Sequence, residues 1–229
     1  MIEVEQLGNV HVVHWHDDEN RFNRKSLDAL NAALDRIEQA DAPCALVSTG
    51  EGKFYSNGFD LDWMATAGSA AEEFPYEVHD LLGRLLTFPA ITVAALNGHA
   101  FGLGAILSAA HDFRVMREDR GYWCLPEVDL GLPLTRSFAA VLTAKLPRET
   151  AHEAIMTGQR YDAVEAQMAG IVNLTAAEDD VLADAVDLAG DFADKPRAVI
   201  ARHKHLLYDD VLRTITDERA RFEARRSER

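Results

Sequence analysis

The stretch Asn97-Gly98-His99-Ala100-Phe101-Gly102-Leu103-Gly104 decides the fold, because its glycines join an apolar strand, residues 91–96, to a helix of small residues, 105–110. Glycine lets the chain turn sharply and lets a ligand approach the main chain closely. The first N–H groups of the helix have no partner within it and carry partial positive charge. The stretch therefore predicts a backbone site for a phosphate, or for a carbonyl oxygen that becomes an anion.

A second stretch, Leu125-Pro126-Glu127-Val128-Asp129-Leu130-Gly131, places the carboxylate of Glu127 among apolar neighbours. Taken alone, a glutamate after a proline is more often a solvated turn residue than a catalytic one, since buried glutamates are rare. The catalytic interpretation of Glu127 therefore depends on what the rest of the chain places around it.

Composition narrows the class of protein. The 229 residues fit one large domain, or one domain with a helical appendage, and 48% of them are apolar, which is enough for a sizeable core. The net charge of -15 argues against binding to nucleic acid or to an anionic membrane surface. Cys44 and Cys124 fall in apolar runs without metal-type spacing, so we expect two buried, reduced thiols.

We expect neither a targeting signal nor a membrane segment. Residues 1–5 lack a cationic region and a hydrophobic run, and no stretch approaches the length of a transmembrane helix. Residues 225–229 match neither a peroxisomal nor an ER-retention tail. Together with the reduced cysteines, these features predict a cytoplasmic protein.

Hydrophobic periodicity predicts alternating strands and helices up to about residue 172, and helices after it. The predicted strands are 2–5 and 10–16, which form a hairpin, and 45–48, 91–96, 113–116, 122–124 and 170–173. The predicted helices are 20–40, 76–86, 105–110, 135–145, 148–157 and 163–168, followed by 176–192, 196–208 and 211–226. Residues 53–60 are expected to form an irregular loop, and residues 65–75 either a mobile lid or a solvated connector.

Three loops together resemble the crotonase (enoyl-CoA hydratase/isomerase) superfamily. Phe54-Tyr55-Ser56-Asn57-Gly58-Phe59-Asp60-Leu61 resembles its first signature loop, and the stretches 97–104 and 125–131 resemble the second and third. Order and spacing agree, and the likeness continues through Thr157-Gly158 and Ala169-Gly170-Ile171-Val172. One glycine-rich loop would be weak evidence, whereas three in this order are specific.

The resemblance implies an α/β fold, a crotonase-like spiral of ββα repeats with a helical C-terminal part. We accordingly place a core with the active site at residues 1–175, and a helical region for assembly and pocket cover at 176–229. The resemblance also implies a homotrimer or hexamer, and an acyl-CoA thioester as the substrate. Coenzyme A is then part of the substrate, so neither a separate cofactor nor a metal is expected.

The resemblance also assigns roles by position. The main-chain N–H groups of Phe59 and Leu103 hold the thioester oxygen while an enolate forms, and each donor contributes about 3 kcal/mol in the transition state. Glu127 moves the proton, and burial is expected to raise its pKa. Substrate binding is expected from the residues around these groups: Lys53, Ser56, Asn57, Gly58, Asp60, Leu61, Gly102, Gly104 and Ile106.

Ile106 departs from the pattern of the hydratases. Those members carry two glutamates, and here Ile106 occupies the first position while Glu127 keeps the second. One carboxylate among apolar residues suits proton transfer between two carbons better than activation of water. This division resembles the Δ3,Δ2-enoyl-CoA isomerases, and the segments 111–116 and 119–121 are close to that branch. The leading hypothesis is an isomerase that converts 3-enoyl-CoA to trans-2-enoyl-CoA, which helps unsaturated fatty acids to enter β-oxidation.

Two alternative functions stay open. A hydratase would need a second carboxylate, from Asp129 or from a residue of the segment 65–75. A catalytically silent member would bind acyl-CoA, or a protein partner, without turnover. Rapid hydration of crotonyl-CoA favours the first alternative, and binding of coenzyme A without any turnover favours the second.

Some side chains have a structural interpretation beside the functional one. Asp60 is expected to cap the next helix rather than to take part in catalysis. His99 is expected to be a structural histidine. Arg21, like Lys53, either meets a phosphate of coenzyme A or is solvated. Trp63 and Phe74 line either the acyl pocket or the core.

Overall fold

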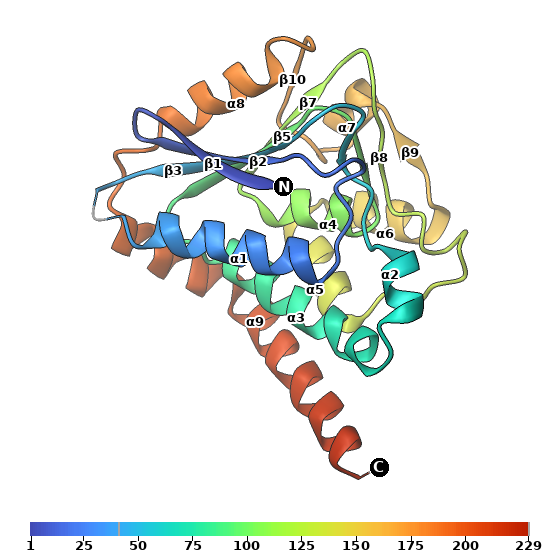
Figure 1. Cartoon of the computed structure of the whole chain (residues 1–229). Coiled ribbons are helices and arrows are strands. Elements are labelled where there is room, and N and C mark those ends of the chain that lie inside the picture. The colour runs from blue at the N-terminus through green and yellow to red at the C-terminus, as the bar shows by residue number, and fades with distance from the viewer. Residues whose placement is uncertain (41, 229) are drawn as a thin grey trace.

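The structure, a computed structural model, describes residues 1–40 and 42–228 and contains two sheets with helices packed around them (Figure 1). The larger sheet has six strands in the order β1-β2-β3-β5-β7-β10. β1 and β2 form the predicted antiparallel hairpin, and all other neighbours in this sheet run parallel. The strands are Ile2–Leu7 (β1), Val10–Trp15 (β2), Ala45–Gly50 (β3), Ile91–Leu96 (β5), Phe113–Arg117 (β7) and Leu174–Ala176 (β10).

The smaller sheet has four short strands in the order β4-β6-β8-β9. They are Phe54–Ser56 (β4), His99–Phe101 (β6), Trp123–Cys124 (β8) and Arg160–Tyr161 (β9). β4, β6 and β8 directly follow β3, β5 and β7 in the chain, so each turn of the chain adds one strand to each sheet before a helix returns it. This is the ββα spiral that the resemblance implies, and the predicted fold class is confirmed.

Nine helices are present in the described part of the chain. Helices α1 to α4 are Arg24–Glu38, Leu61–Thr66, Ser69–Leu86 and Leu103–Ala110. Helices α5 to α9 are Arg136–Lys145, Arg148–Thr157, Ala163–Met168, Val181–Gly190 and Arg197–Ser227. Figure 1 shows α8 on one side of the larger sheet, and α1 and α3 on the other.

Apolar side chains cover both faces of the larger sheet, because successive residues of a strand point to opposite sides. Val12 and Val47 belong to a cluster with Ala185 of α8. Their neighbours in sequence, Val13 and Leu46, belong to the main core with α1 and α3. Burial on both faces explains why the central strand β5, Ile91–Leu96, is an almost continuous apolar run in the sequence.

Short strands account for most of the differences from the predicted elements. Residues 53–60 and 97–101, predicted as a loop and a turn, contain β4 and β6, and β9 was not predicted. Strands of two or three residues are too short to show alternation. Residues 170–173 form no strand; the chain joins the sheet just after them, as β10.

Helix boundaries also differ. α1 begins later than predicted because Asn23 caps it, accepting a hydrogen bond of 3.1 Å from the N–H of Ser26. The segment 65–75 is largely helical, since it spans the end of α2 and the start of α3. α8 begins at Val181, after β10. The two helices predicted at 196–208 and 211–226 are one helix, α9, whose sequence contains neither glycine nor proline.

α9 is anchored to the core by its first half. The Nζ of Lys204 lies 2.6 Å from Oδ2 of Asp112 and donates a 2.7 Å hydrogen bond to the carbonyl of Ala90. The helix then packs on α3 and α5, and its last turns extend beyond the rest of the chain (Figure 1). The predicted boundary at 175/176 falls within β10.

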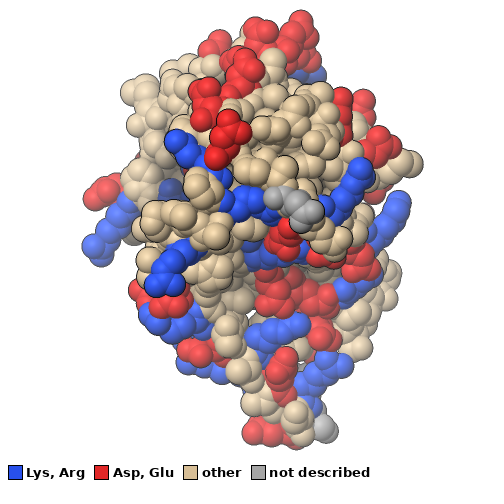
Figure 2. All heavy atoms as spheres, turned by 90° about the vertical axis from the view of Figure 1, so that its left-hand side faces the viewer, with Lys and Arg blue, Asp and Glu red and all other residues tan. Residues whose placement is uncertain are grey.

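Charge is unevenly distributed over the surface. Figure 2 shows acidic side chains gathered at the top of the face turned to the viewer, and a mixture of basic and acidic groups below them. Exposed acidic residues of the segment before α8 and of α8 itself include Glu178, Asp179, Asp180, Asp184 and Asp187. Cys44 and Cys124 are both buried free thiols, as predicted. Within the described ranges, no helix has both the length and the apolar character that crossing a bilayer requires.

Candidate active site

A cavity of about 420 Å³ opens where the β4–α2 loop, the start of α4 and the segment after β8 meet. All three signature stretches contribute to its wall. Of the predicted site residues, eight line it: Asn57, Gly58, Phe59, Leu61, Gly102, Leu103, Ile106 and Glu127.

The N-terminus of α4 opens toward this cavity. Gly102 precedes the helix with a φ of 54°, and no side chain caps the helix. The N–H of Leu103 has no acceptor within the described ranges. At the other end of α4, the carbonyls of Ser108, Ala109 and His111 accept hydrogen bonds of 2.9 to 3.3 Å from Nη1 of Arg114. The helix therefore holds a cation at its negative end and presents its positive end to the cavity.

A second free donor lies on the β4–α2 loop. Phe59 forms a parallel bridge with Phe22, in which Gly58 accepts from Phe22 and Asp60 donates to it. The two hydrogen bonds engage the carbonyl of Gly58 and the N–H of Asp60, the residues before and after Phe59. The N–H of Phe59 itself therefore faces away from Phe22. It has no acceptor among residues 1–40 and 42–228.

The two loops that carry these donors are in close contact. A Cβ atom placed on Gly58 would lie 3.2 Å from the nitrogen of Leu103 and 2.9 Å from the carbonyl oxygen of Phe101. Glycine at this position, with a φ of 79°, therefore permits both the turn and the approach. The contact brings Phe59 and Leu103 to one wall of the cavity.

Glu127 lies over the start of α4. A Cβ atom placed on Gly102 would be 3.1 Å from Oε1 of Glu127, which fixes the carboxylate above the helix terminus. The Oε2 atom is buried and has no hydrogen-bond partner. Loss of solvation raises the pKa of this carboxyl group, and its own backbone N–H lowers it by less. A glutamate with a free, buried oxygen and a raised pKa is suited to carry a proton.

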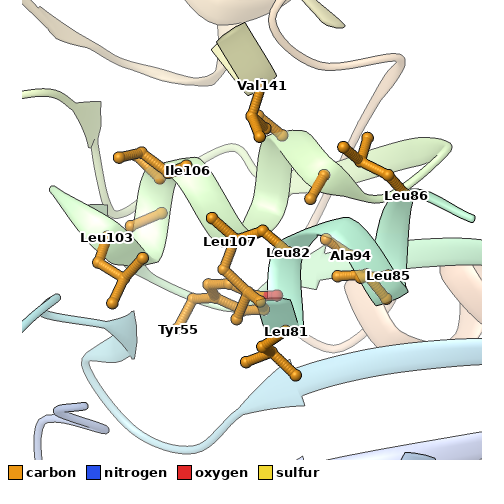
Figure 3. Packing of buried hydrophobic residues seen from close by; sticks show 14 of the residues in the cluster. Tyr55, Leu81, Leu82, Leu85, Leu86, Ala94, Leu103, Ile106, Leu107 and Val141 are labelled. Atoms are coloured by element: carbon orange, nitrogen blue, oxygen red, sulfur yellow. The ribbon is translucent and has the colours of Figure 1, made fainter. Parts of the chain in front are cut away.

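The wall around Glu127 is apolar. Ile106 is 1% exposed and lines the cavity one turn along α4 from the open N–H groups (Figure 3). Phe138 of α5 and Leu134 continue this wall. Figure 3 shows Leu103, Ile106 and Leu107 projecting from α4 in different directions, with Leu107 turned into the core beside Leu81.

The rim of the cavity is polar. The guanidinium of Arg21 lies 2.6 Å from Glu19, which also accepts a 2.7 Å hydrogen bond from Asn57. Asp62 lies 3.4 Å from the other side of the Arg21 guanidinium, and its side chain is 94% exposed. Hydrogen bonds from Asn57 lower the pKa of Glu19, with a smaller contribution from Arg21. The rim thus contains a cation that is already paired with two carboxylates.

Four predicted binding residues do not line the cavity. Ser56 is buried and donates a 2.7 Å hydrogen bond to the carbonyl of Asn20. Asp60 caps α2 by accepting from the N–H of Trp63 at 3.0 Å, as its structural interpretation predicts. Gly104 packs against Ser56, whose carbonyl oxygen would be 2.3 Å from a Cβ at this position. Lys53 is exposed, with its Nζ 5.3 Å from the centre of the Phe54 ring.

Two of the side chains with alternative interpretations belong to the core. Phe74 is fully buried, and Trp63 packs edge-on against it at 4.7 Å between ring centres, outside the cavity. The Nδ1 of His99 accepts a 3.1 Å hydrogen bond from the N–H of Tyr122, which is a structural role. Within the described ranges, no group of three or more His, Cys, Asp or Glu side chains is arranged to hold a metal.

The sequence interpretation missed part of the lining. Phe101, Pro126, Leu130, Leu132, Pro133, Leu134 and Phe138 belong to it. Leu130 and Leu132 are about half exposed, at 59% and 46%. A run of leucines and a proline directly after Glu127 was the available indication, because such residues are not expected in a solvated turn.

Comparison with known proteins agrees with this geometry. The family model described as enoyl-CoA hydratase/isomerase matches residues 5–226. Two Arabidopsis thaliana proteins are similar: enoyl-CoA delta isomerase 2, peroxisomal (37% identity; 85% of this chain and 86% of that protein) and enoyl-CoA delta isomerase 3 (34%; 87% and 88%). Further relatives, from Thermus thermophilus and Salmonella typhi, carry the names of a hydratase and a dehydratase.

Solved structures give the same result. A Mycobacterium tuberculosis protein described as an enoyl-CoA isomerase superposes with a TM-score of 0.89, at 26% identity over 97% of both chains. The family model covers nearly the whole chain, and the matched region contains all three loops that form the cavity. The chain belongs to the enoyl-CoA hydratase/isomerase family.

Proposed function

We propose that this protein is an enoyl-CoA isomerase, which shifts the double bond of 3-enoyl-CoA to give trans-2-enoyl-CoA with one proton-carrying glutamate. One observation carries the proposal. Among the described residues, Glu127 is the only carboxylate that lines the cavity with a buried, unpartnered oxygen, and Ile106 fills the position where hydratases of the family have a second glutamate. The names of the Arabidopsis relatives support the same activity.

The first step uses the two free main-chain donors. The thioester oxygen of the substrate would accept hydrogen bonds from the N–H groups of Phe59 and Leu103, which line the cavity together. The positive end of α4 adds to this field. As charge moves to the oxygen, each donor is expected to contribute about 3 kcal/mol of transition-state stabilisation.

The second step is proton transfer. The carboxylate of Glu127 takes the proton from C2, and the electron pair of that C–H bond spreads over a dienolate that ends at the thioester oxygen. Glu127 then returns the same proton to C4, which leaves the double bond between C2 and C3. A raised pKa suits both halves of the step, because the group must act first as a base and then as an acid.

The apolar wall supports this choice over hydration. A proton that moves between two carbons needs no water, and Ile106, Phe138 and Leu134 line the cavity that contains the glutamate with side chains that cannot bind one. The proposed reaction needs no resident cofactor, since coenzyme A arrives with the substrate. The two buried free thiols suit a reducing, cytoplasmic location.

The geometry weakens the hydratase alternative that relies on other carboxylates. The Oδ2 atom of Asp129 would be 2.7 Å from a Cβ on Gly158, so this side chain faces the end of α6 and does not line the cavity. No residue of the segment 65–75 lines it either. Asp62 is on the rim, exposed and paired with Arg21.

The experiment compares the loss of two carboxylates from the turn after β8, those of Glu127 and Asp129. We expect wild-type protein to convert 3-hexenoyl-CoA to its conjugated isomer, followed by absorbance, with at most slow hydration of crotonyl-CoA. Glu127→Gln is expected to lower kcat roughly 100- to 10,000-fold, because it removes the general base. Asp129→Asn, two residues away and outside the cavity, is the matched control and should retain activity.

Three results would contradict the proposal. Undiminished isomerase activity in Glu127→Gln would exclude the single-glutamate mechanism. Rapid crotonyl-CoA hydration that Asp129→Asn abolishes would favour the hydratase, and coenzyme A binding without any turnover would favour a silent member of the family.

A further inference from the structure

A chain of side-chain hydrogen bonds lies behind the cavity, among residues that no proposed step uses. The hydroxyl of Tyr55 is 2.8 Å from Oγ of Ser48, which is 2.8 Å from Nε2 of His111. The Nδ1 of His111 is 3.0 Å from the carbonyl of Leu107. Tyr55 and His111 are 2% and 1% exposed. We call this series, from Tyr55 to Leu107, the hydroxyl–imidazole chain.

The direction of every bond in this chain is determined. A carbonyl only accepts, so Nδ1 of His111 must carry the proton and donate to Leu107. The imidazole is neutral, since burial lowers its pKa to about 3, and Nε2 is therefore an acceptor. Ser48 must then donate to His111, and its oxygen accepts from Tyr55. Each donor in the series therefore faces an acceptor.

The hydroxyl–imidazole chain joins the two elements that carry the oxyanion donors. Tyr55 lies on β4, four residues before Phe59, and His111 ends α4, which begins at Leu103. Figure 3 shows Tyr55 beneath α4, beside Leu107. At the start of α4, Gly104 already contacts Ser56 of β4. β4 therefore contacts the N-terminus of α4 directly, and its Tyr55 reaches the C-terminus of α4 through Ser48 of β3.

We propose that the hydroxyl–imidazole chain positions the two N–H donors of the oxyanion site. The inference rests on the proposed function for the identity of the substrate oxygen. A rigid helix that is fixed at one end can tilt or slide, whereas one fixed at both ends keeps its first N–H at a constant place beside Phe59. Tyr55, Ser48 and His111 are thus positioning residues, since none of them lines the cavity.

Tyr55→Phe is the mildest test. It removes one hydroxyl from the end of the chain and leaves Ser48 bonded to His111. Displacement of a reacting group by about 1 Å can cost about 100-fold in rate, so we expect kcat for 3-hexenoyl-CoA to fall roughly 10- to 100-fold. KM should change by less than about threefold, because the coenzyme A contacts remain and only transition-state binding is lost.

Ser48 offers a rescue pair, and Tyr161 offers a control. Ser48→Ala breaks the chain in the middle and should lower kcat at least as much as Tyr55→Phe, whereas Ser48→Thr keeps a hydroxyl on the strand and should restore it. Tyr161→Phe removes another buried tyrosine hydroxyl, which is bonded to Glu153 at 2.7 Å and lies outside the cavity. It should leave kcat unchanged.

A readout independent of isomerisation separates this inference from the proposed function. Acetoacetyl-CoA loses its C2 proton readily, and its enolate absorbs light when a site stabilises the negative oxygen. We expect enolate absorbance with wild-type protein and Tyr161→Phe, and a roughly 10-fold weaker enolate in Tyr55→Phe. If wild-type protein forms the enolate but does not isomerise 3-hexenoyl-CoA, the proposed function fails, and a weaker enolate in Tyr55→Phe would still support the positioning inference. Unchanged kcat and enolate absorbance in both Tyr55→Phe and Ser48→Ala, or no enolate with wild-type protein, would overturn the inference.

Discussion

Burial controls the proton affinity of Glu127. Its carboxyl group lies above the start of α4 with one oxygen that no group contacts through a hydrogen bond, and loss of solvation raises its pKa. The same side chain is therefore easy to protonate and remains a competent base at neutral pH.

The pH dependence of the reaction follows from this pKa. We expect kcat/KM for 3-hexenoyl-CoA to rise with pH as Glu127 loses its proton, with a midpoint above the ordinary glutamate value of 4.5. A pH profile of the wild-type protein measures the midpoint. Activity that stays constant down to pH 4.5 would show that the proton carrier is a different group.

The stability of the protein should respond in the opposite sense. A carboxyl whose pKa is raised by folding stabilises the fold below its unfolded pKa, and this contribution is lost as pH rises through the folded pKa. At pH 7 the ionised Glu127 thus opposes folding, and Glu127→Gln should raise Tm by roughly 2–4 °C. Calorimetry at pH 7 and pH 4 checks this, since the gain should disappear at pH 4. A lower Tm for the variant at pH 7 would contradict it.

At the scale of elements, the junction between β6 and α4 depends on one glycine. Gly102 has a φ of 54° and a ψ of -120°, a conformation that only glycine adopts readily, and a Cβ atom at this position would lie 3.1 Å from Oε1 of Glu127. Gly102→Ala should destabilise the fold by about 1–3 kcal/mol and lower kcat at least 10-fold, because the new methyl group displaces the carboxylate.

Gly8→Ala is the matched control for this substitution. Gly8 has a φ of 61° in the turn between β1 and β2, and nothing lies within 4 Å of a Cβ at that position. It shares the positive φ of Gly102 but not the proximity to Glu127. Both kcat and stability to urea should be measured for the two variants. Equal losses of kcat would show that backbone strain, and not displacement of the Glu127 carboxylate, lowers the activity of Gly102→Ala.

Elements with strong local patterns were predictable. β5 and α4 have continuous apolar runs, and glycines mark the turn between them, so the sequence located both. β4, β6 and β9 were missed, because a strand of two or three residues exists only through its neighbours in the sheet. α9 was divided at residues 209–210, since two aspartates resemble a helix boundary, yet both lie on the surface of one continuous helix.

The candidate site was predictable where it depends on the main chain. The resemblance of the three loops to the superfamily identified Phe59, Leu103 and Glu127 as candidates, and all three line one cavity. Side-chain contributions from distant segments were not visible. Phe138 reaches the cavity from α5, a position that depends on how helices pack and not on local spacing, and Lys53 lies in the turn before β4 and does not line the cavity.

At the scale of the whole molecule, α9 carries apolar side chains that are exposed to solvent in the single chain. Leu206 and Leu207 are 69% and 73% exposed. We expect self-association to bury them, as a trimer or hexamer. Light scattering should then give three or six times the chain mass of 25.3 kDa. Leu206→Glu with Leu207→Glu should lower this mass, whereas a monomeric wild-type protein would contradict the expectation.

The eight residues of α4 also limit how the chain can be lengthened. An inserted residue turns a helix by about 100° and advances it by about 1.5 Å. Within α4, one insertion would move either the Arg114 end or the Leu103 end out of place, whatever residue is added. The open turn at Gly8 has no such restriction and can accept a peptide tag or a fluorescent label.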